Sequence, residues 1–396
     1  MLLVLTACRQ VVEEPASAEQ SPEKTQTEAE APKAQTELLD FAFEVASQLP
    51  VKPHLHTRSE SQNSVVTTAL DLGRVDLAEK YVPQLKNWRR GTAHADIALY
   101  YARHGDMDKA REHLHMADQV YKAITDWHTE RVAAHMARCH AYMNEDERAE
   151  QLSDEKAVDI DRVAPAAVET AAEEEYAAML AKAVADLESE DFNAIRRGLA
   201  LAVALYDRFY TSERRRAEVA EIVRDSMQLL APSLQINSLC HMARHALDHE
   251  DSATASALLA DARQRYANAT WKPRFGIPWL ARIAGLAFEA NDAELGKAVL
   301  EQANSIYDEA RESIVNIYRA ETLAPIAEAY QQAGYPEKAR AVYLRALEEC
   351  LVNPNSRPRA VDLTLLSRSM ARHDVEPTPE LWTALRDTRA QLGDPW

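Results

Sequence analysis

Histidine supplies the first candidate chemistry in this chain of 396 residues. His241, His245 and His249 recur every fourth residue, so on a helix their imidazoles project from one side. Two such rings can chelate a soft or borderline metal ion. No carboxylate is placed beside them, since Glu250 and Asp251 fall at the predicted helix end. We therefore expect solvated surface histidines, with a metal site as the weaker alternative.

The remaining reactive side chains predict no catalysis. Cys139 and Cys240 are each followed by histidine, but neighbouring residues on a helix point about 100° apart and do not face each other. We expect Cys139, Cys240 and Cys350 to be buried free thiols. The sequence contains no glycine-rich phosphate loop, zinc-protease helix motif or nucleophile elbow. These observations favour a protein that is not an enzyme and needs no cofactor.

Cys8 is the fourth cysteine, and its surroundings are distinctive. The run Leu5-Thr6-Ala7-Cys8 resembles the lipobox of bacterial lipoproteins, in which a diacylglycerol is attached to the cysteine sulfur. The resemblance implies lipidation of Cys8, an envelope location with the folded part in the periplasm or at the cell surface, and membrane contact through the lipid alone. Only seven residues precede Cys8 and none is basic, whereas a secretory signal has a positive start and a longer apolar run. Residues 1–8 therefore read as a truncated signal segment, and the alternative is an incidental cysteine in a cytoplasmic protein.

Residues 9–36 read as a disordered acidic tether. They are rich in Glu, Gln, Ala, Pro, Ser and Thr and have almost no large apolar side chain after Val12. Such a segment cannot bury enough apolar surface to offset the entropy lost on ordering.

An internal repeat predicts the fold of residues 37–396. The stretch from Arg90 to Arg111 matches the stretch from Arg319 to Arg340 at many positions. Weaker copies share a turn-type residue placed five positions before a small one: Gly73/Ala78, Gly105/Ala110, Asn144/Ala149, Glu250/Ala255, Asn291/Gly296 and Gly334/Ala339. Around these pairs, small and apolar residues recur at steps of three, four and seven, which indicates two helices, A and B, separated by the turn-type residue.

This pattern resembles the tetratricopeptide repeat family, with the longer spacing of HEAT-like helical repeats. The resemblance implies an all-α solenoid of stacked antiparallel helix pairs that binds a partner peptide or helix on its concave face. Residues 163–231 are less regular, and we expect an irregular insert there. Helices near 360–372 and 379–392 should end the solenoid with a polar outer face.

Composition agrees with this fold and excludes one class of partner. The chain has 46% hydrophobic residues and only 9 glycines, which favours helices over a sheet. Its net charge of −18 argues against nucleic-acid binding, and the run Arg214-Arg215-Arg216 is its one dense basic spot. Trp88 and Trp127 lie 39 residues apart, each before an A helix, and we expect both to pack between layers.

The sequence therefore predicts a non-catalytic scaffold or adaptor whose protein or peptide partner it does not identify. Residues on A helices but off the packing positions are the candidates for the groove: Asp96, Tyr100, Arg103 and Arg138. The segment 270–279, with Trp271, Phe275 and two prolines, reads as a loop that either binds a partner or plugs a gap between units. The alternative function is a small-molecule or metal sensor that uses the three histidines or this loop.

Overall fold

The turn-type residues of the repeat shape the backbone at the ends of the A helices. In the computed structural model, which describes residues 33–153 and 163–396, the six predicted turn positions all have positive φ: Gly73 71°, Gly105 80°, Asn144 56°, Glu250 61°, Asn291 62° and Gly334 75°. Left-handed backbone ends an α-helix and starts a tight turn, which explains glycine or asparagine at most of these places. Asp374 repeats the same conformation with φ of 50°, so the chain contains a further unit that the sequence pattern did not reveal.

The first residue after the turn often caps the B helix. Asp106, Asp251 and Asp292 accept a hydrogen bond from the backbone N–H three residues later, at 3.1, 2.9 and 3.1 Å. Such caps satisfy one of the free N–H groups at a helix start. Five of the six paired small residues are alanines, and all five are almost fully inaccessible, which lets the A and B axes approach closely.

The described residues form helices and no strand, which confirms the all-α prediction. The even-numbered helices are α2 (Val51–Asp71), α4 (Arg89–Arg103), α6 (His128–Tyr142), α8 (Val163–Thr170), α10 (Phe192–Arg208), α12 (Pro232–Asp248), α14 (Pro273–Glu289), α16 (Arg319–Gln332) and α18 (Ser356–Arg372). The odd-numbered helices are α1 (Lys33–Gln48), α3 (Val75–Tyr81), α5 (Met107–Ala123), α7 (Asp146–Leu152), α9 (Tyr176–Leu187), α11 (Glu213–Ser226), α13 (Ser252–Ala267), α15 (Ala293–Ala310), α17 (Pro336–Leu351) and α19 (Pro379–Ala390). Short 3₁₀ turns lie at Val82–Gln84, Glu173–Glu175, Met227–Leu229, Arg311–Ser313 and Asn316–Tyr318.

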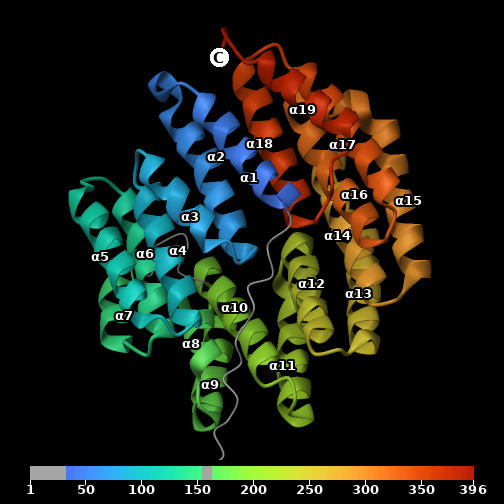
Figure 1. Cartoon of the computed structure of the whole chain (residues 1–396). Helices are drawn as coiled ribbons and strands as arrows, with labels where there is room; N and C mark the ends of the chain where they lie inside the picture. The colour runs from blue at the N-terminus through green and yellow to red at the C-terminus, as the bar shows by residue number, and fades with distance from the viewer. Residues whose placement is uncertain (1–32, 154–162) are drawn as a thin grey trace, which may run out of the picture. The chain divides into compact units, whose positions relative to one another are not determined.

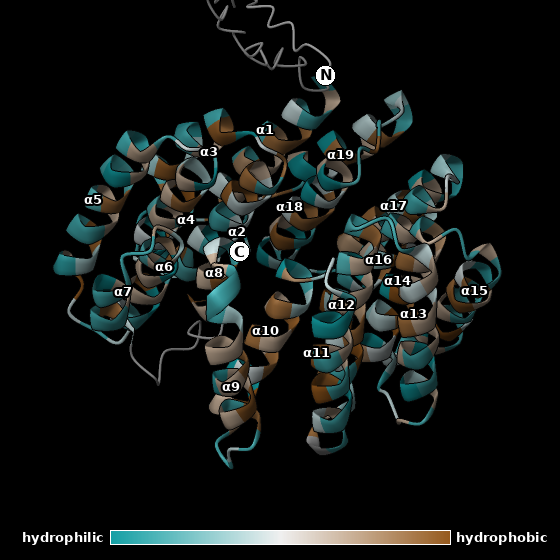
Figure 2. Ribbon diagram, turned by 90° about the horizontal axis from the view of Figure 1, so that it is seen from below, coloured by the Kyte–Doolittle hydropathy of each residue, from teal (hydrophilic) through white to brown (hydrophobic). Residues whose placement is uncertain are grey.

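Within residues 33–396, the even-numbered helices form a closed inner row. Each packs on the next, from α2 to α18, and α18 packs back on α2 (Figure 1). Most odd-numbered helices cover the outer side; Figure 2 shows α5 outside α4 and α15 outside α14. The described part of the chain is therefore a helical-repeat ring.

Helix α1 completes this ring by packing on α18 as a B helix packs on its A helix. The side-chain amide of Gln35 donates to the carbonyl of Ala371 at 3.1 Å, and the Phe41 and Trp382 rings meet edge to face with centroids 6.0 Å apart. The Arg389 guanidinium donates to Glu44 at 2.7 Å. The prediction that 360–372 and 379–392 form a polar open end is wrong for α18, because α1 and α2 cover it.

The other departures from prediction concern helix boundaries. The start of α2 is irregular, with non-helical backbone at Lys52 and His54. The irregular insert is built from α8 to α11, where α9 packs chiefly on α10. The predicted loop at 270–279 is largely the start of α14, with Pro273 as its first residue and Pro278 inside the helix. Proline is well tolerated at a helix start because its missing N–H would have no partner there.

Candidate functional site

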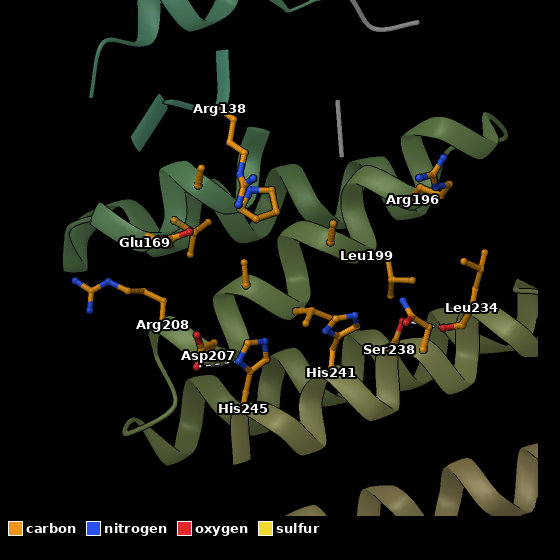
Figure 3. A pocket seen from close by; sticks show the side chains of 17 residues that line it. Arg138, Glu169, Arg196, Leu199, Asp207, Arg208, Leu234, Ser238, His241 and His245 are labelled. Atoms are coloured by element: carbon orange, nitrogen blue, oxygen red, sulfur yellow. Dashed lines mark hydrogen bonds and ion pairs between the residues drawn. The ribbon is translucent and has the colours of Figure 1, made fainter. Parts of the chain in front are cut away.

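Two adjoining cavities open on the inner row. The first, the α4–α6 cavity, has a volume of about 710 Å³ and is lined from α2, α4, α6 and α18. The second, the α10–α12 cavity of Figure 3, has about 760 Å³ and is lined from α6, α8, α10 and α12. Arg138 lines both. Volumes of this size suit a small molecule or a short length of peptide.

The four predicted groove residues lie together in the α4–α6 cavity, on α4 and α6. The Arg103 Nε donates to the Glu169 carboxylate at 2.9 Å, and the Tyr100 hydroxyl donates to the carbonyl of Gly73 at 3.2 Å. Asp96 accepts from His135 at 2.8 Å and lies 3.9 Å from an Arg138 nitrogen. These side chains are thus held in place by one another and by neighbouring helices, so the wall they form is pre-arranged.

Sequence analysis missed two arginines of this cavity. Arg89 is only 8% exposed, and its Nη2 lies 3.4 Å from a Glu60 oxygen. Its Nη1 is buried without any hydrogen-bond partner, and so is the Nε of Arg131. Both guanidiniums lie on the indole of Trp88, at 4.4 Å for Arg89 and 5.4 Å for Arg131. Burial, reinforced by the charge of Arg131, lowers the pKa of Arg89.

The only sequence signal for this cluster was the pair of tryptophans. Trp88 is half-buried and fits the packing prediction, but Trp127 is 58% exposed, so the same prediction is wrong there. Arg131 also lies 5.4 Å from the Trp127 ring, and Trp127 stacks on His128 with centroids 3.8 Å apart. Trp127 thus contacts this arginine and histidine at the surface and does not fill the space between layers.

The predicted histidine stripe borders the α10–α12 cavity. His241 and His245 project from α12 towards it, and Asp207 of α10 faces His245 (Figure 3). An Asp207 oxygen lies 3.2 Å from His245 Nδ1 and 3.1 Å from His249 Nε2. Burial opposes ionisation of Asp207, but the two imidazoles outweigh it and lower the pKa of the carboxyl.

A carboxylate therefore does stand beside the stripe, which corrects the expectation that none is placed there. It comes from another helix, 38 residues before His245 in the sequence. His245 is half-buried rather than fully solvated, while His241 and His249 are exposed or nearly so. No set of three or more His, Cys, Asp or Glu side chains among the described residues is arranged to hold a metal ion.

The aromatic segment lies apart from both cavities. Trp271 is half-buried, stacks on Tyr266 with centroids 5.4 Å apart, and donates its indole N–H to the Tyr266 carbonyl at 3.0 Å. Phe275 is 52% exposed. Both line a third cavity of about 630 Å³ that shares no lining residue with the first two. Trp271 thus fills the junction of α13 and α14, and Phe275 leaves an apolar surface open.

The cysteines divide into two groups. Cys139, Cys240 and Cys350 are buried free thiols, as predicted, and burial raises the pKa of each. Cys8 lies outside the described residues, as do residues 9–32 of the predicted tether. The prediction of a tether as far as residue 36 is wrong at its end, because α1 already begins at Lys33 and packs on α18.

None of the described helices is both long enough and apolar enough to cross a lipid bilayer.

Comparison with known proteins identifies no family for this chain. No protein-family model matches the chain, and no curated protein matches it. Among solved structures it is similar to one described as a circular tandem repeat protein with novel repeat topology and enhanced subunit contact surfaces. That match covers 90% of this chain and 94% of the other, with 15% sequence identity and a TM-score of 0.20. The helical-repeat ring therefore rests on the contacts within this chain.

Proposed function

We propose that the protein is a non-catalytic binding protein that holds an extended segment of a partner protein along the inner face of its ring. The observation that carries the proposal is the pair of adjoining cavities on the A helices, joined at Arg138. Helical repeats offer such a surface because each A helix contributes one strip of side chains to a continuous face. The two cavities together offer more volume than a single small-molecule site usually has.

The lining has the mixed character of a peptide site. Leu99, Leu199 and Val203 supply apolar contact, while Asn63, Asn237 and Ser238 supply hydrogen-bonding groups. Among the described residues, five arginines and three carboxylates line the α4–α6 cavity, although the whole chain has a net charge of −18. This local balance favours a partner segment with acidic groups.

Photo-cross-linking tests the proposal. A photoreactive amino acid replaces Thr67 or Ala200, which line the two cavities, in the full chain expressed in its native host. Matched controls carry it at Glu112 of α5 and Lys297 of α15, two exposed positions on outer helices. We expect the inner positions to capture one common partner, with both adducts mapping to a single segment of its sequence. Equal capture from the outer positions, or none from the inner ones, would contradict the proposal.

The finer family and location are part of the same proposal. Membership of a tetratricopeptide-like group is supported by the repeat spacing, and an envelope location by Cys8 and the tether that follows it. If Cys8 carries a lipid, the protein expressed from its natural gene should sediment with membranes, and Cys8→Ser should reduce that fraction. Equal sedimentation of the two forms would remove the anchor from the proposal.

A further inference from the structure

The two arginines on Trp88 stand out because their charge is not balanced within the fold. Arg89 begins α4 and Arg131 lies in the first turn of α6, so two adjacent A helices bring their guanidiniums onto one indole ring. Among the described residues, the carboxylate nearest Arg89 is that of Glu60, and no carboxylate lies within 4 Å of Arg131. Two positive charges therefore face one negative charge, and the side chain of Glu60 is 58% exposed to screening water.

Unused hydrogen-bonding groups occur in the same place. Arg89 is more than nine-tenths buried, yet its Nη1 donates to nothing, and the Arg131 Nε also lacks an acceptor. Asn63, which lines the same cavity from α2, has a side-chain oxygen without a donor. A buried polar atom without a partner costs free energy. Three such atoms around one cavity therefore indicate that a bound group would supply the missing hydrogen bonds.

We propose that Arg89, Arg131 and Trp88 form an anchor site for a carboxylate group of the bound partner segment. A carboxylate brings the single negative charge that the two guanidiniums lack, and its two oxygens match the paired N–H groups of a guanidinium. The indole ring holds both guanidiniums in position by cation–π contact. This inference rests on the proposed function, since it names the chemistry that the inner face recognises.

A carboxylate of a peptide has two sources, an acidic side chain or the free C-terminus. The probes separate them: fluorescent N-acetylated pentaglutamate amide, pentaglutamine amide and pentaalanine with a free C-terminus. Binding to the full chain is followed by fluorescence anisotropy in about 0.15 M salt, where charges farther apart than the Debye length are screened. We expect pentaglutamate, the free-acid pentaalanine, or both to bind, and pentaglutamine not to bind.

The variants assign any binding to the site. Arg89→Gln and Arg131→Gln should each weaken it about tenfold or more, because a charge-assisted hydrogen bond is lost. Glu60→Gln should strengthen it severalfold, since it removes the internal carboxylate that competes for Arg89. Arg263→Gln, an exposed arginine on the outer helix α13, should change nothing. Arg131 is only half-buried, so its variant keeps the test open if Arg89→Gln unfolds.

Three results would overturn the anchor site. They are no binding of either carboxylate peptide, equal binding by wild type and both arginine variants, and displacement of the peptides by inorganic phosphate at lower concentration than by acetate. Failure of the broader proposal looks different. If Thr67 and Ala200 still capture a partner while the peptides fail, the inner face binds a segment without this anchor, and only the carboxylate assignment falls.

Discussion

The two most similar repeats each begin with a buried arginine, but the two guanidiniums differ in how many of their N–H groups have a partner. Arg319 opens α16 and is 8% exposed, as Arg89 is at the start of α4. Arg319 donates from Nε to the carbonyl of Ile314 at 2.8 Å, and it lies 3.5 Å from Glu349, whose side chain is only 4% exposed. Arg89 has one partly exposed carboxylate and an unused Nη1. The first residue of the A helix is thus a fully paired arginine in one copy and an incompletely paired arginine in the other, although the two stand one residue apart in the alignment of the copies.

Other residues that align between the two copies make equivalent structural contacts in both. The Tyr101 hydroxyl donates to Glu79 of α3 at 2.7 Å, and the Tyr330 hydroxyl accepts from Asn304 of α15 at 3.0 Å. Each tyrosine therefore links its A helix to the preceding outer helix. The shared residues stabilise the stack, and the contrast between Arg319 and Arg89 distinguishes a paired structural arginine from the arginine of the proposed anchor site.

The largest expected effect is at Arg319. Arg319→Met should lower the free energy of unfolding by about 3 kcal/mol, because Glu349 would keep only Arg311 as a partner in its buried site. Arg89→Met should cost far less, since it removes a buried charge whose pairing is already incomplete. Urea unfolding of both variants measures the difference. Equal losses would show that the two arginines have the same structural role.

The aromatic segment allows a second comparison, between the packed side chain of Trp271 and the exposed side chain of Phe275. Trp271→Ala should lower the free energy of unfolding by roughly 2–3 kcal/mol, because the stack on Tyr266 and the indole hydrogen bond are lost. The loss should be smaller than for a fully buried tryptophan, because Trp271 is only half-buried. Phe275→Ala should stay within about 0.5 kcal/mol, as exposed substitutions do. Thermal unfolding of the two variants tests this. A stable Trp271→Ala protein would mean that the junction of α13 and α14 does not depend on this ring.

The equivalent alanines should respond alike. Ala110 and Ala339 are both 0% exposed, so Ala→Leu at either should overpack the helix crossing by about 1–3 kcal/mol. Hydrogen exchange should loosen first in the altered pair and its two neighbours, because repeats are coupled through adjacent contacts. Uniform loosening over all described helices would indicate a single cooperative unit instead.

The smallest expected effect depends on pH. Burial, with the charge of Glu321, raises the pKa of Asp362 well above its usual range, and Asp362 is 3% exposed. A raised carboxyl pKa stabilises the fold below the pKa of the unfolded chain and loses that contribution as pH rises through the folded value. Asp362→Asn should therefore gain melting temperature relative to wild type as pH goes from 4 to 7.

Asp207 is the matched control with the opposite sign. Its pKa is lowered in the fold, so its contribution is present at neutral pH and is lost as pH falls through the folded value. Asp207→Asn should lose melting temperature at pH 7 and approach wild type in acid. If both variants shift in the same direction with pH, the two carboxyls do not differ as described.

Sequence reasoning predicted the local order of this fold well. The six turn positions and their paired small residues follow from steps of three, four and seven, which reflect contacts inside one helix pair. The same reasoning placed Asp96, Tyr100, Arg103 and Arg138 on A helices, and they line one cavity. Such features depend on residues that are close in sequence.

The features that sequence reasoning missed join distant residues. The contact of α1 with α18 brings together residues more than 330 positions apart, such as the Gln35 side chain and the Ala371 carbonyl, and no repeat pattern encodes it. Asp207 reaches the histidines only because α10 packs on α12. The two prolines of segment 270–279 favour a loop when only the local sequence is considered, but Pro273 suits a helix start and begins α14. Arg89 was missed because the copies align Arg319 with its exposed neighbour Arg90.

The packing of α18 on α2 also has a consequence for how the molecule is made. During translation, α2 and α4 leave the ribosome long before α18 is synthesised. The hydrogen bonds from Arg368 to the Ser64 carbonyl and from Arg372 to the Thr68 hydroxyl therefore form late. The contact of α2 with α18 can therefore form only after α18 has been synthesised, and it lies beside the α4–α6 cavity, which Arg368 lines. The cavity therefore lacks one of its walls until α18 has been translated, and a chain terminated before α18 would lack that wall.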